Sequence, residues 1–368
     1  MEHPAIQRRT SRQVHVGPVA IGGGAPVSVQ SMTNTPTRDV EATVAQIGRL
    51  AGAGADIVRV AVPTQADTAA LGAILARSPV PIVADVHFHF ERALEAVAAG
   101  VHKIRLNPGN IADRDRVRRV IDACGERGIP IRIGVNEGSI VERRDGAKRA
   151  AEEAAPLVDL MMAKLESYLA IFDACGFGDL VLAAKSPDAL TCIEATRRMA
   201  RRWDYPLHLG VTHAGDLETG IIRSSAALGA LLADGIGETI RISLAADPVE
   251  EVRAARELLA ALRLRAREEA EIIACPTCGR IQIDLLPLVA AIRRALRGRG
   301  AGLKVAVMGC VVNGPGEAAD AHVAVCGGKG SGVLYVDGRR VRTVAEADIV
   351  AAVVAEVERY GRRAEAQG

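Results

Sequence analysis

Aromatic residues are scarce in this chain. One Trp, four Tyr and four Phe make up 2% of its 368 residues, whereas hydrophobic residues make up 49%. A core large enough for one large domain or two smaller ones therefore has to be packed with Val, Ile, Leu and Ala. Because proteins that bind single-stranded nucleic acid stack its bases on aromatic side chains, this scarcity also argues against a nucleic-acid partner.

An excess of one charge and a long apolar run are absent too. The chain has 46 Lys and Arg against 44 Asp and Glu, a formal net charge of +2, which does not favour binding to nucleic acid or to a membrane surface. No run approaches eighteen apolar residues, and Met1–Arg9 lacks the apolar stretch of a signal peptide. We therefore expect a soluble cytoplasmic protein.

The cysteines do not form a paired set. They number seven and are scattered along the chain, which does not fit a disulfide framework. Cys124, Cys175 and Cys192 each stand alone within or beside helical patterns. At these three positions we expect small buried hydrophobic residues.

The C-terminal part lacks a fourth cysteine at a ligand spacing. Cys275-Pro-Thr-Cys278 is followed by Cys310 and then by Glu317, in Cys310-Val-Val-Asn-Gly-Pro-Gly-Glu317. Iron–sulfur clusters are normally held by four thiolates and structural zinc by four Cys or His ligands. Three thiolates with a weak or open fourth position indicate a metal site that acts on a bound substrate. Cys326 is the alternative fourth ligand, although we favour a buried structural thiol there.

Short runs of β-branched residues alternate with longer helical stretches, such as Arg38–Ala53, Gln65–Arg77 and Ile111–Arg127. Near-continuous apolar strands that alternate with helices indicate a parallel sheet covered on its outer face. Eight such units fit a TIM barrel better than an open doubly wound sheet. The preceding Val14–Ile21 predicts a hairpin that closes the bottom of the barrel. The eight strand-like runs are Pro26–Ser31, Asp56–Val62, Pro81–Val86, Lys103–Leu106, Pro130–Val135, Asp179–Ala183, Pro206–Val211 and Thr239–Leu244.

Arginine recurs inside four of these strands, at Arg59, Arg105, Arg132 and Arg241. A guanidinium buried without a partner is prohibitively unfavourable, and Asp85 is the one acid that we identify at the predicted strand ends. A polyanion shared in the barrel mouth, such as a diphosphate, would satisfy all four arginines through forked hydrogen bonds. The alternative is that the four arginines point outward and keep solvated heads.

Polar residues follow the predicted strands at their carboxyl ends, where the active sites of TIM barrels lie. The sequence therefore predicts an active site at this end of the barrel. These residues are Asn34, Asp85, His87, Asn107, Asn136, Lys185, His213 and Ser243.

A change of composition after the charged stretch Leu258–Glu271 predicts a boundary between a barrel domain, residues 1–264, and a second domain, residues 265–368. The second domain has the pattern of a small α+β unit. Its glycine-rich Gly327–Gly332 lacks the spacing of a phosphate-binding loop and no helix follows it, so it predicts a hairpin turn. The predicted elements are a helix over Asp284–Arg297, strands over Leu303–Met308, His322–Val325 and Val333–Val336, and a helix over Val344–Arg362.

Nine segments spread along the chain carry a family resemblance. They are Ser28–Asn34, Ala55–Val60, Ala84–Phe88, Arg105–Asn110, Ile129–Asn136, His208–Thr212, Arg241–Pro248, Ala274–Gly279 and Met308–Ala318. In these segments the chain resembles the 4-hydroxy-3-methylbut-2-enyl diphosphate synthase family of the methylerythritol phosphate route to isoprenoids. The last two segments are the most specific.

The resemblance implies an oxidoreductase with a TIM barrel followed by a [4Fe–4S] domain. Enzymes of the family open 2-C-methyl-D-erythritol 2,4-cyclodiphosphate and reductively remove an oxygen, which gives the linear allylic diphosphate. The electrons come one at a time from reduced flavodoxin or ferredoxin. The family works as a homodimer in which the cluster domain of one chain caps the barrel of the other.

The resemblance also implies roles for individual residues. Asp85 and His87 would orient the substrate or move protons, and Glu317 would be an exchangeable ligand that takes part in catalysis. The expected cluster ligands are Cys275, Cys278, Cys310 and Glu317. The expected substrate-binding residues are Arg59, Arg105, Asn107, Arg132, Asn136, Lys185, Arg241, Ser243 and Asn313.

One position departs from the family pattern. The family typically has a glutamate, thought to assist proton transfer, where this chain has His213, in Thr212-His213-Ala214-Gly215. Histidine can also act as a general acid or base near neutral pH. Either His213 takes over the role, which we favour, or Glu218 reaches in from the following loop, or the role matters less.

Two other functions are compatible with parts of the sequence. A barrel enzyme of the pterin-binding type would also offer Asn and Asp to a ring and cations to a diphosphate, but it leaves the C-terminal cysteines without a role. A zinc module that binds nucleic acid through Arg263–Arg267 fits the first two cysteines. Glu317 is an unusual ligand for structural zinc, however, and the low aromatic content and near-zero net charge count against nucleic acid.

Overall fold

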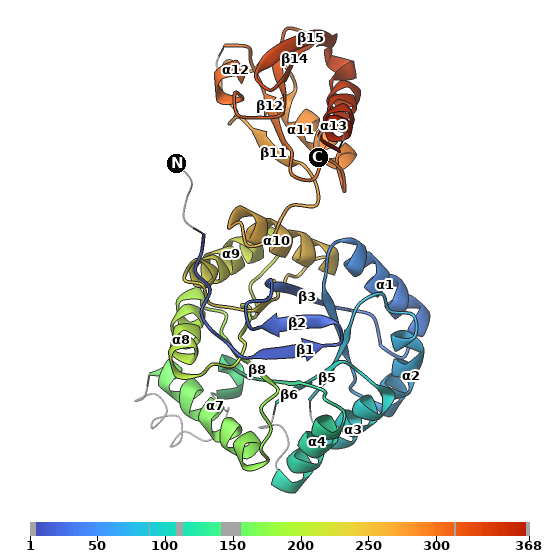
Figure 1. Cartoon of the computed structure of the whole chain (residues 1–368), viewed down its shortest axis with the longest axis vertical. Helices are drawn as coiled ribbons and strands as arrows, with labels where there is room; N and C mark the ends of the chain where they lie inside the picture. Colours follow the sequence, from blue (N-terminus) through green and yellow to red (C-terminus); the bar gives the residue numbers. More distant parts are fainter. Residues whose placement is uncertain (1–4, 88, 108–112, 141–155, 313, 366–368) are drawn as a thin grey trace. The chain divides into compact units, whose positions relative to one another are not determined.

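The structure, a computed structural model, describes residues 5–87, 89–107, 113–140, 156–312 and 314–365. The chain divides into two compact units, Met1–Arg265 and Ala266–Gly368, which we call the barrel unit and the C-terminal unit (Figure 1). Within the described ranges, no helix is long and apolar enough to cross a membrane.

Eight parallel strands form the sheet of the barrel unit, in the order β8-β7-β6-β5-β4-β3-β10-β9. A bridge between Leu182 and Leu207 joins the two ends of this order, so the sheet closes on itself. The predicted TIM barrel is therefore confirmed, although the last two strands are shorter than expected. The strands are β3 (Ser28–Met32), β4 (Ile57–Ala61), β5 (Ile82–Val86), β6 (Lys103–Leu106), β7 (Ile131–Asn136), β8 (Leu180–Lys185), β9 (His208–Leu209) and β10 (Thr239–Ile240).

Helices surround this sheet (Figure 1). Several begin directly after an aspartate whose carboxylate accepts a backbone N–H of the first turn, which satisfies a donor that the helix itself leaves open. These N-caps are Asp39, Asp113, Asp188, Asp216 and Asp247. The helices are α1 (Val40–Gly52), α2 (Gln65–Leu75), α3 (Phe90–Ala99), α4 (Arg114–Glu126), α5 (Glu137–Ile140), α7 (Leu157–Ala174), α8 (Ala189–Arg202), α9 (Leu217–Ala233) and α10 (Pro248–Ala261).

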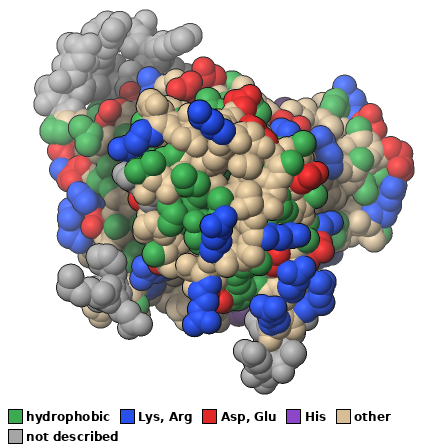
Figure 2. Space-filling model, turned by 90° about the horizontal axis from the view of Figure 1, so that it is seen from above, with side chains coloured by type: hydrophobic (Ala, Val, Ile, Leu, Met, Phe, Trp, Pro, Cys, Tyr) green, Lys and Arg blue, Asp and Glu red, His purple; other side chains and the backbone are tan. Residues whose placement is uncertain are grey.

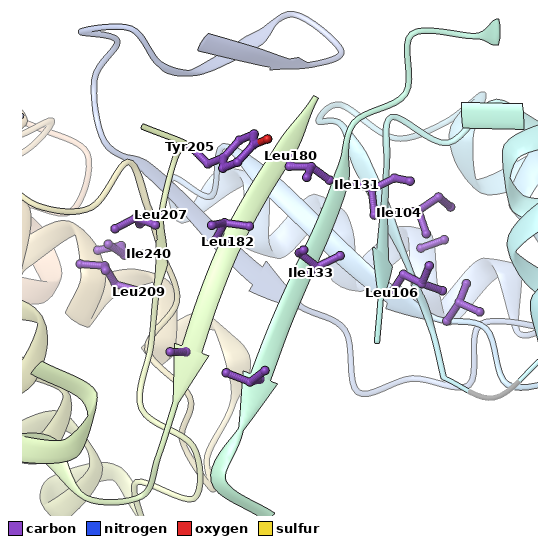
Figure 3. Close-up of a cluster of buried hydrophobic side chains, with 14 of the residues drawn as sticks. Ile104, Leu106, Ile131, Ile133, Leu180, Leu182, Tyr205, Leu207, Leu209 and Ile240 are labelled. Carbon is purple, nitrogen blue, oxygen red and sulfur yellow. The ribbon is translucent and has the colours of Figure 1, made fainter. Parts of the chain in front are cut away.

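Alternate strand residues pack against the helices and form the main core. Figure 3 shows this packing for Ile104 and Leu106, Ile131 and Ile133, and Leu180 and Leu182, all of them buried. Because successive side chains of a strand point to opposite faces, the residues between them point into the barrel. The strand arginines occupy such inward positions.

A hairpin of β1 (Gln13–Val16) and β2 (Val19–Gly22) lies across one end of the barrel, as Figure 1 shows. Its apolar side chains form a separate cluster with residues near the starts of the barrel strands. The predicted hairpin at the bottom of the barrel is therefore confirmed. The buried members of the cluster are Val14, Val16, Ile21, Ile57, Val83 and Val181.

The C-terminal unit is a five-stranded mixed sheet in the order β11-β12-β13-β14-β15. The first three strands are parallel, whereas β14 is antiparallel to both of its neighbours. A hairpin turn at Lys329-Gly330 joins β13 to β14, which confirms the interpretation of the glycine-rich segment. The elements are β11 (Glu271–Ala274), α11 (Leu285–Ala295), β12 (Lys304–Met308), α12 (Gly314–Glu317), β13 (Val323–Gly328), β14 (Ser331–Val336), β15 (Arg339–Ala345), a short 3₁₀ helix (Glu346–Asp348) and α13 (Ile349–Glu365).

Two strands of this unit were not predicted. β11 lies at the end of a charged stretch and none of its residues is fully buried. β15 is an edge strand exposed on nearly all of its residues, so neither shows the alternation of buried and exposed residues that marks a strand. The closing helix predicted from Val344 begins at Ile349 instead, because Val344 belongs to β15.

The surface carries both charges. Figure 2 shows Lys and Arg interspersed with Asp and Glu over one face of the molecule, as expected for a net charge of +2. All seven cysteines are free, and Cys124 and Cys192 are buried as predicted while Cys175 is half-buried.

Candidate active site

A cavity of about 240 Å³ opens at the carboxyl ends of the barrel strands. Nine of the barrel residues singled out in the sequence line it, together with Gly134, Ala183 and Thr212. The nine are Arg59, Asp85, His87, Arg105, Arg132, Asn136, Lys185, Arg241 and Ser243. The fold thus brings residues of separate strands together at the expected end of the barrel.

Asp85 is an acid in the lining of the cavity. Its Oδ2 lies 3.6 Å from Nε of Arg59 and 3.4 Å from Nε2 of His87, and its Oδ1 accepts from Nη1 of Arg105 at 3.2 Å. Burial alone would raise the pKa of this carboxyl, but Arg59, His87 and Arg105 together hold the pKa well below its usual range. Asp85 therefore stays ionised and fixes two arginines.

Glu251 is a second acid, which the sequence interpretation missed. It lies in the first turn of α10, and its side chain is 3% exposed. Its two carboxylate oxygens accept from Nε and Nη2 of Arg241, each at 3.2 Å, and also from the backbone N–H of Leu244 at 3.0 Å and Oγ of Ser31 at 3.2 Å. The view that Asp85 alone meets the strand arginines is therefore wrong. The sequence feature that could have identified Glu251 is its position in the first turn of the helix that follows the strand of Arg241.

Met32 gives two of these arginines a further, softer contact. Its sulfur accepts from Nε and Nη2 of Arg59 at 3.1 and 3.0 Å and from Nη1 of Arg241 at 3.5 Å. A thioether sulfur is a weak acceptor, so Met32 orients the guanidinium groups without neutralising them. Burial, followed by the nearby Arg241 and Arg105, lowers the pKa of Arg59 to about 10 despite the charge of Asp85.

Among the described residues, Arg132 and Lys185 are the cavity cations without a counter-ion. Neither forms an ion pair with any residue that the structure describes, and both are buried. Burial and then the neighbouring arginines lower the pKa values of both groups well below their ordinary values. The cavity lining has five Lys and Arg side chains, against the carboxylates of Asp85 and Glu251, so basic side chains outnumber carboxylates by three. Such an excess in a buried cavity favours a polyanion.

Gly210 leaves the space that Lys185 occupies. A Cβ atom at this position would lie 2.6 Å from Nζ of Lys185 and 2.8 Å from the carbonyl oxygen of Arg241. Both distances are shorter than real Cβ contacts. The glycine therefore leaves room for the ammonium of Lys185 and for the backbone of Arg241.

Some predicted residues lie outside the cavity lining. Asn107 is 5% exposed and accepts a hydrogen bond from the hydroxyl of Tyr168 at 3.2 Å. His213 is exposed, with a positive φ of 52°, and it is the neighbouring Thr212 that lines the cavity. Glu218 is exposed in the first turn of α9, and Asn313 lies outside the described residues.

In the C-terminal unit, two candidate ligands follow neighbouring parallel strands. Cys275 comes directly after β11, and Cys310 follows β12. Because parallel strands end at the same edge of a sheet, the fold brings these thiols to one edge. The backbone N–H of Gly309 donates to Sγ of Cys275 at 3.1 Å, a bond that stabilises a thiolate.

The other two candidate ligands are exposed. Cys278 lies in the loop after β11, and Glu317 ends the single turn of α12. Among the residues with described positions, no three His, Cys, Asp or Glu side chains are grouped closely enough to hold a metal ion. The fold thus gathers two of the four proposed ligands at one sheet edge.

Cys326 lies on β13, opposite Met308 of β12, and is fully buried. Burial, with smaller contributions from Cys310 and Cys275, raises the pKa of its thiol to about 12. Its full burial within a strand fits the structural thiol expected at this position.

Two family models match the chain. The model of the GcpE TIM-barrel domain matches residues 11–256, and that of the GcpE protein C-terminal domain matches residues 271–359. Similar proteins include the 4-hydroxy-3-methylbut-2-en-1-yl diphosphate synthase (flavodoxin) of Geobacter sulfurreducens, 47% identical over 95% of this chain and 97% of the relative. The protein of that name from Symbiobacterium thermophilum is 48% identical over 99% and 96%. Dihydropteroate synthase of Yersinia pestis aligns with 68% of this chain and 97% of its own at a TM-score of 0.46 and 14% identity, too weak a likeness to argue from.

Proposed function

Because this chain belongs to the GcpE family of 4-hydroxy-3-methylbut-2-en-1-yl diphosphate synthases, we propose that its substrate is 2-C-methyl-D-erythritol 2,4-cyclodiphosphate. The product is (E)-4-hydroxy-3-methylbut-2-enyl diphosphate. The substrate gains two electrons and one proton and loses one water, so an oxygen leaves while the diphosphate ring opens. The chain is thus an oxidoreductase of isoprenoid biosynthesis.

The observation that carries this proposal is the uncompensated charge of the cavity. Five cations face two carboxylates, and a diphosphate supplies the missing negative charge together with oxygens that accept forked hydrogen bonds from arginine. Arg132 and Lys185, which have no ion-pair partner in the described structure, are the natural primary contacts. Arg59, Arg105 and Arg241 are held in place by Asp85 and Glu251 and add further donors.

The uncharged cavity residues suit the rest of the substrate. Asn136 and Ser243 line the cavity and add hydrogen bonds. The pair of Asp85 and His87 orients the substrate or moves a proton, because His87 reaches both the carboxylate and Arg105 at 3.3–3.4 Å. Asn107 and Asn313 remain proposed substrate contacts. His213 remains the proposed replacement for the family glutamate.

The C-terminal unit would hold a [4Fe–4S] cluster. Its proposed ligands are Cys275, Cys278, Cys310 and Glu317. Two thiols at one sheet edge, one of them accepting a backbone N–H, fit a cluster, whose sulfur ligands are thiolates that such bonds stabilise. When bound, the cluster supplies single electrons and an iron with a carboxylate ligand that exchanges more readily than a thiolate.

The proposed partners follow from the family. Reduced flavodoxin, which the names of the relatives include, or ferredoxin delivers the electrons. We propose a homodimer in which the C-terminal unit of one chain covers the barrel of the other. A cavity lined by buried cations would benefit from such a cover, because exclusion of water strengthens their interaction with bound phosphate.

The test is anaerobic purification followed by binding and turnover. We expect a brown protein with iron and without stoichiometric zinc, which binds the cyclic diphosphate and converts it when reduced flavodoxin is added. Arg132→Met should weaken binding at least tenfold, about 1.4 kcal/mol, whereas the matched Arg118→Met on the exposed face of α4 should not. A colourless zinc protein, or equal affinities for the two variants, would contradict the proposal.

A further inference from the structure

Below the cavity the barrel contains a second layer of polar side chains, which we call the deep polar tier. The inside of a TIM barrel is normally filled with Val, Ile and Leu. Here several inward positions carry groups that can ionise or form hydrogen bonds, and none of them is more than 1% exposed. The tier consists of Ser28, Gln30, Lys103, His208 and Thr239.

The strand register places Lys103 and Thr239 one inward position beneath residues of the cavity. Lys103 precedes Arg105 by two residues on β6, and Thr239 precedes Arg241 by two residues. Thr239 is also the register partner of both Ser28 and His208 on the neighbouring strands. The apolar cluster of the hairpin and the strand starts closes the barrel at its other end. The tier thus lies between the anion site and this apolar closure.

The polar atoms of the tier have no hydrogen-bond partner among the described residues. This holds for Nζ of Lys103, both ring nitrogens of His208, both amide atoms of Gln30 and the hydroxyls of Ser28 and Thr239. Buried polar groups are nearly always paired. A layer of five such residues therefore indicates groups whose partner arrives from outside the chain, as water or as ligand charge.

The charges that face Lys103 are of its own sign. Arg132 on β7 and Arg59 on β4 are the charged groups that act on it most strongly, and both disfavour its ammonium form. Lys185, Arg105 and Arg241 extend the same positive field across the cavity. Asp85 is engaged by Arg59 and Arg105, and Glu251 by Arg241. No carboxylate of the described structure is left to stabilise a charge on Lys103.

Burial and this field both favour the neutral amine. Burial and then Arg132 and Arg59 lower the pKa of Lys103 well below its ordinary value. Burial and then Arg132, Lys185 and Lys103 lower the pKa of His208 in the same way. Because the ordinary pKa of lysine is about four units above that of histidine, Lys103 rather than His208 is the group of the tier that an added anion more readily returns to its charged form.

We propose that Lys103 is a proton-coupled sixth cation of the anion site, neutral in the free enzyme and protonated when the cyclic diphosphate binds above it. The inference rests on the anion-binding role proposed for the cavity. The negative charge of the phosphates offsets the field of the arginines, and the proton is taken from solvent without any redox change. Since the bound state holds more protons, binding should tighten as pH falls and weaken as pH rises.

The test is calorimetric titration of the oxidised holoenzyme with the cyclic diphosphate in two buffers of different ionisation enthalpy. Each phosphorus of this ligand has one ester and one anhydride bond and keeps a single, strongly acidic hydroxyl, so the charge of the ligand stays constant near neutral pH. We expect the wild type to take up about one proton per ligand more than Lys103→Met does. Affinity at neutral pH should fall about tenfold in Lys103→Met, and Lys329→Met in the exposed hairpin turn should match the wild type.

Two further variants test whether Lys103 is the group that takes up the proton. Lys103→Arg carries a permanent charge, so it should bind with the reduced proton uptake of Lys103→Met. His208→Gln should keep the uptake of the wild type. Equal uptake in wild type and Lys103→Met, or loss of uptake in His208→Gln alone, would overturn the assignment. A wild type that does not bind the ligand would instead refute the proposed function.

Should Lys103→Met fail to fold, the pH dependence of binding by the wild type still tests the inference. The dissociation constant for the cyclic diphosphate is then measured across pH. With Lys103 coupled to binding, the logarithm of this constant rises by up to about one per pH unit over the titration range. A constant that does not change with pH would exclude the inference.

Discussion

Replacement of Glu251 by glutamine should separate the charge of this residue from its shape. Glutamine keeps one acceptor oxygen for the N–H of Leu244 but presents an amide N–H₂ to Arg241, whose Nε and Nη2 each lie 3.2 Å from the carboxylate. Breaking a buried ion pair on one side costs about 3–5 kcal/mol. Because the Arg241 side chain is 15% exposed, solvent screens part of this effect, and we expect a loss near the lower end, about 3 kcal/mol.

Thermal unfolding of the ligand-free protein measures this loss. For a unit of this size, about 3 kcal/mol corresponds to a lower Tm by about 6–12 °C. The matched control is Glu250→Gln, one residue earlier on the same helical turn. Glu250 and its partner Arg253 are both substantially exposed, at 37% and 41%, so this control should change Tm by little.

Equal melting temperatures of the two variants would refute this reasoning. If Glu251→Gln and Glu250→Gln unfold at the same temperature, the carboxylate of Glu251 does not hold Arg241 in the way that the distances imply. The variant also raises the excess of cavity cations from three to four. Added cyclic diphosphate should therefore raise the Tm of Glu251→Gln by more than it raises the Tm of the wild type, and a smaller rise would contradict the charge argument.

Four other outcomes are expected. Gly210→Ala should weaken binding of the cyclic diphosphate at least tenfold, about 1.4 kcal/mol, because the new Cβ would lie 2.8 Å from the carbonyl oxygen of Arg241. Calorimetric titration measures this loss. The control is Gly72→Ala, at a helical position with open space around it. Because the pKa of Asp85 is lowered in the folded protein, its carboxylate stabilises the fold above the unfolded pKa of about 3.9, and this contribution is lost as pH falls towards the folded pKa. In denaturant unfolding, the difference in unfolding free energy between wild type and Asp85→Asn should shrink below about pH 4. A difference that stays constant with pH would contradict this prediction. Glu317→Ala should lose iron faster than the wild type and turn over slowly, whereas Cys326→Ala should retain its iron; the reverse order, by iron content and visible absorption, would make Cys326 the fourth ligand. His213→Ala should lower turnover while leaving affinity for the cyclic diphosphate unchanged, and full turnover would remove His213 from the mechanism.

The barrel and most of its mouth could be predicted from the sequence for a simple reason. A buried parallel strand reads as an apolar run, so an arginine within it, such as Arg105 between Ile104 and Leu106, stands out. Such a residue must lie on the inner face when its neighbours pack against helices. The positions of Asp85 and Lys185 at strand ends followed from the same pattern.

The partners of these residues could not be predicted in this way. Glu251 belongs to a helix and reaches Arg241 only because α10 packs back onto β3. Its burial depends on tertiary structure, and its neighbour Glu250 looks identical in the sequence. Lys103 and His208 likewise look like ordinary strand residues in the sequence. Whether a polar atom has a hydrogen-bond partner among the described residues depends on the fold and leaves no local pattern.

The hairpin at the foot of the barrel has a kinetic consequence. Because Val14, Val16 and Ile21 pack against the strand starts, the interior of the described barrel exchanges with bulk water through the mouth. A ligand seated there then obstructs the route by which protons and water leave the layer beneath. The proton on Lys103 would then stay bound for as long as the ligand does, and the two would dissociate together.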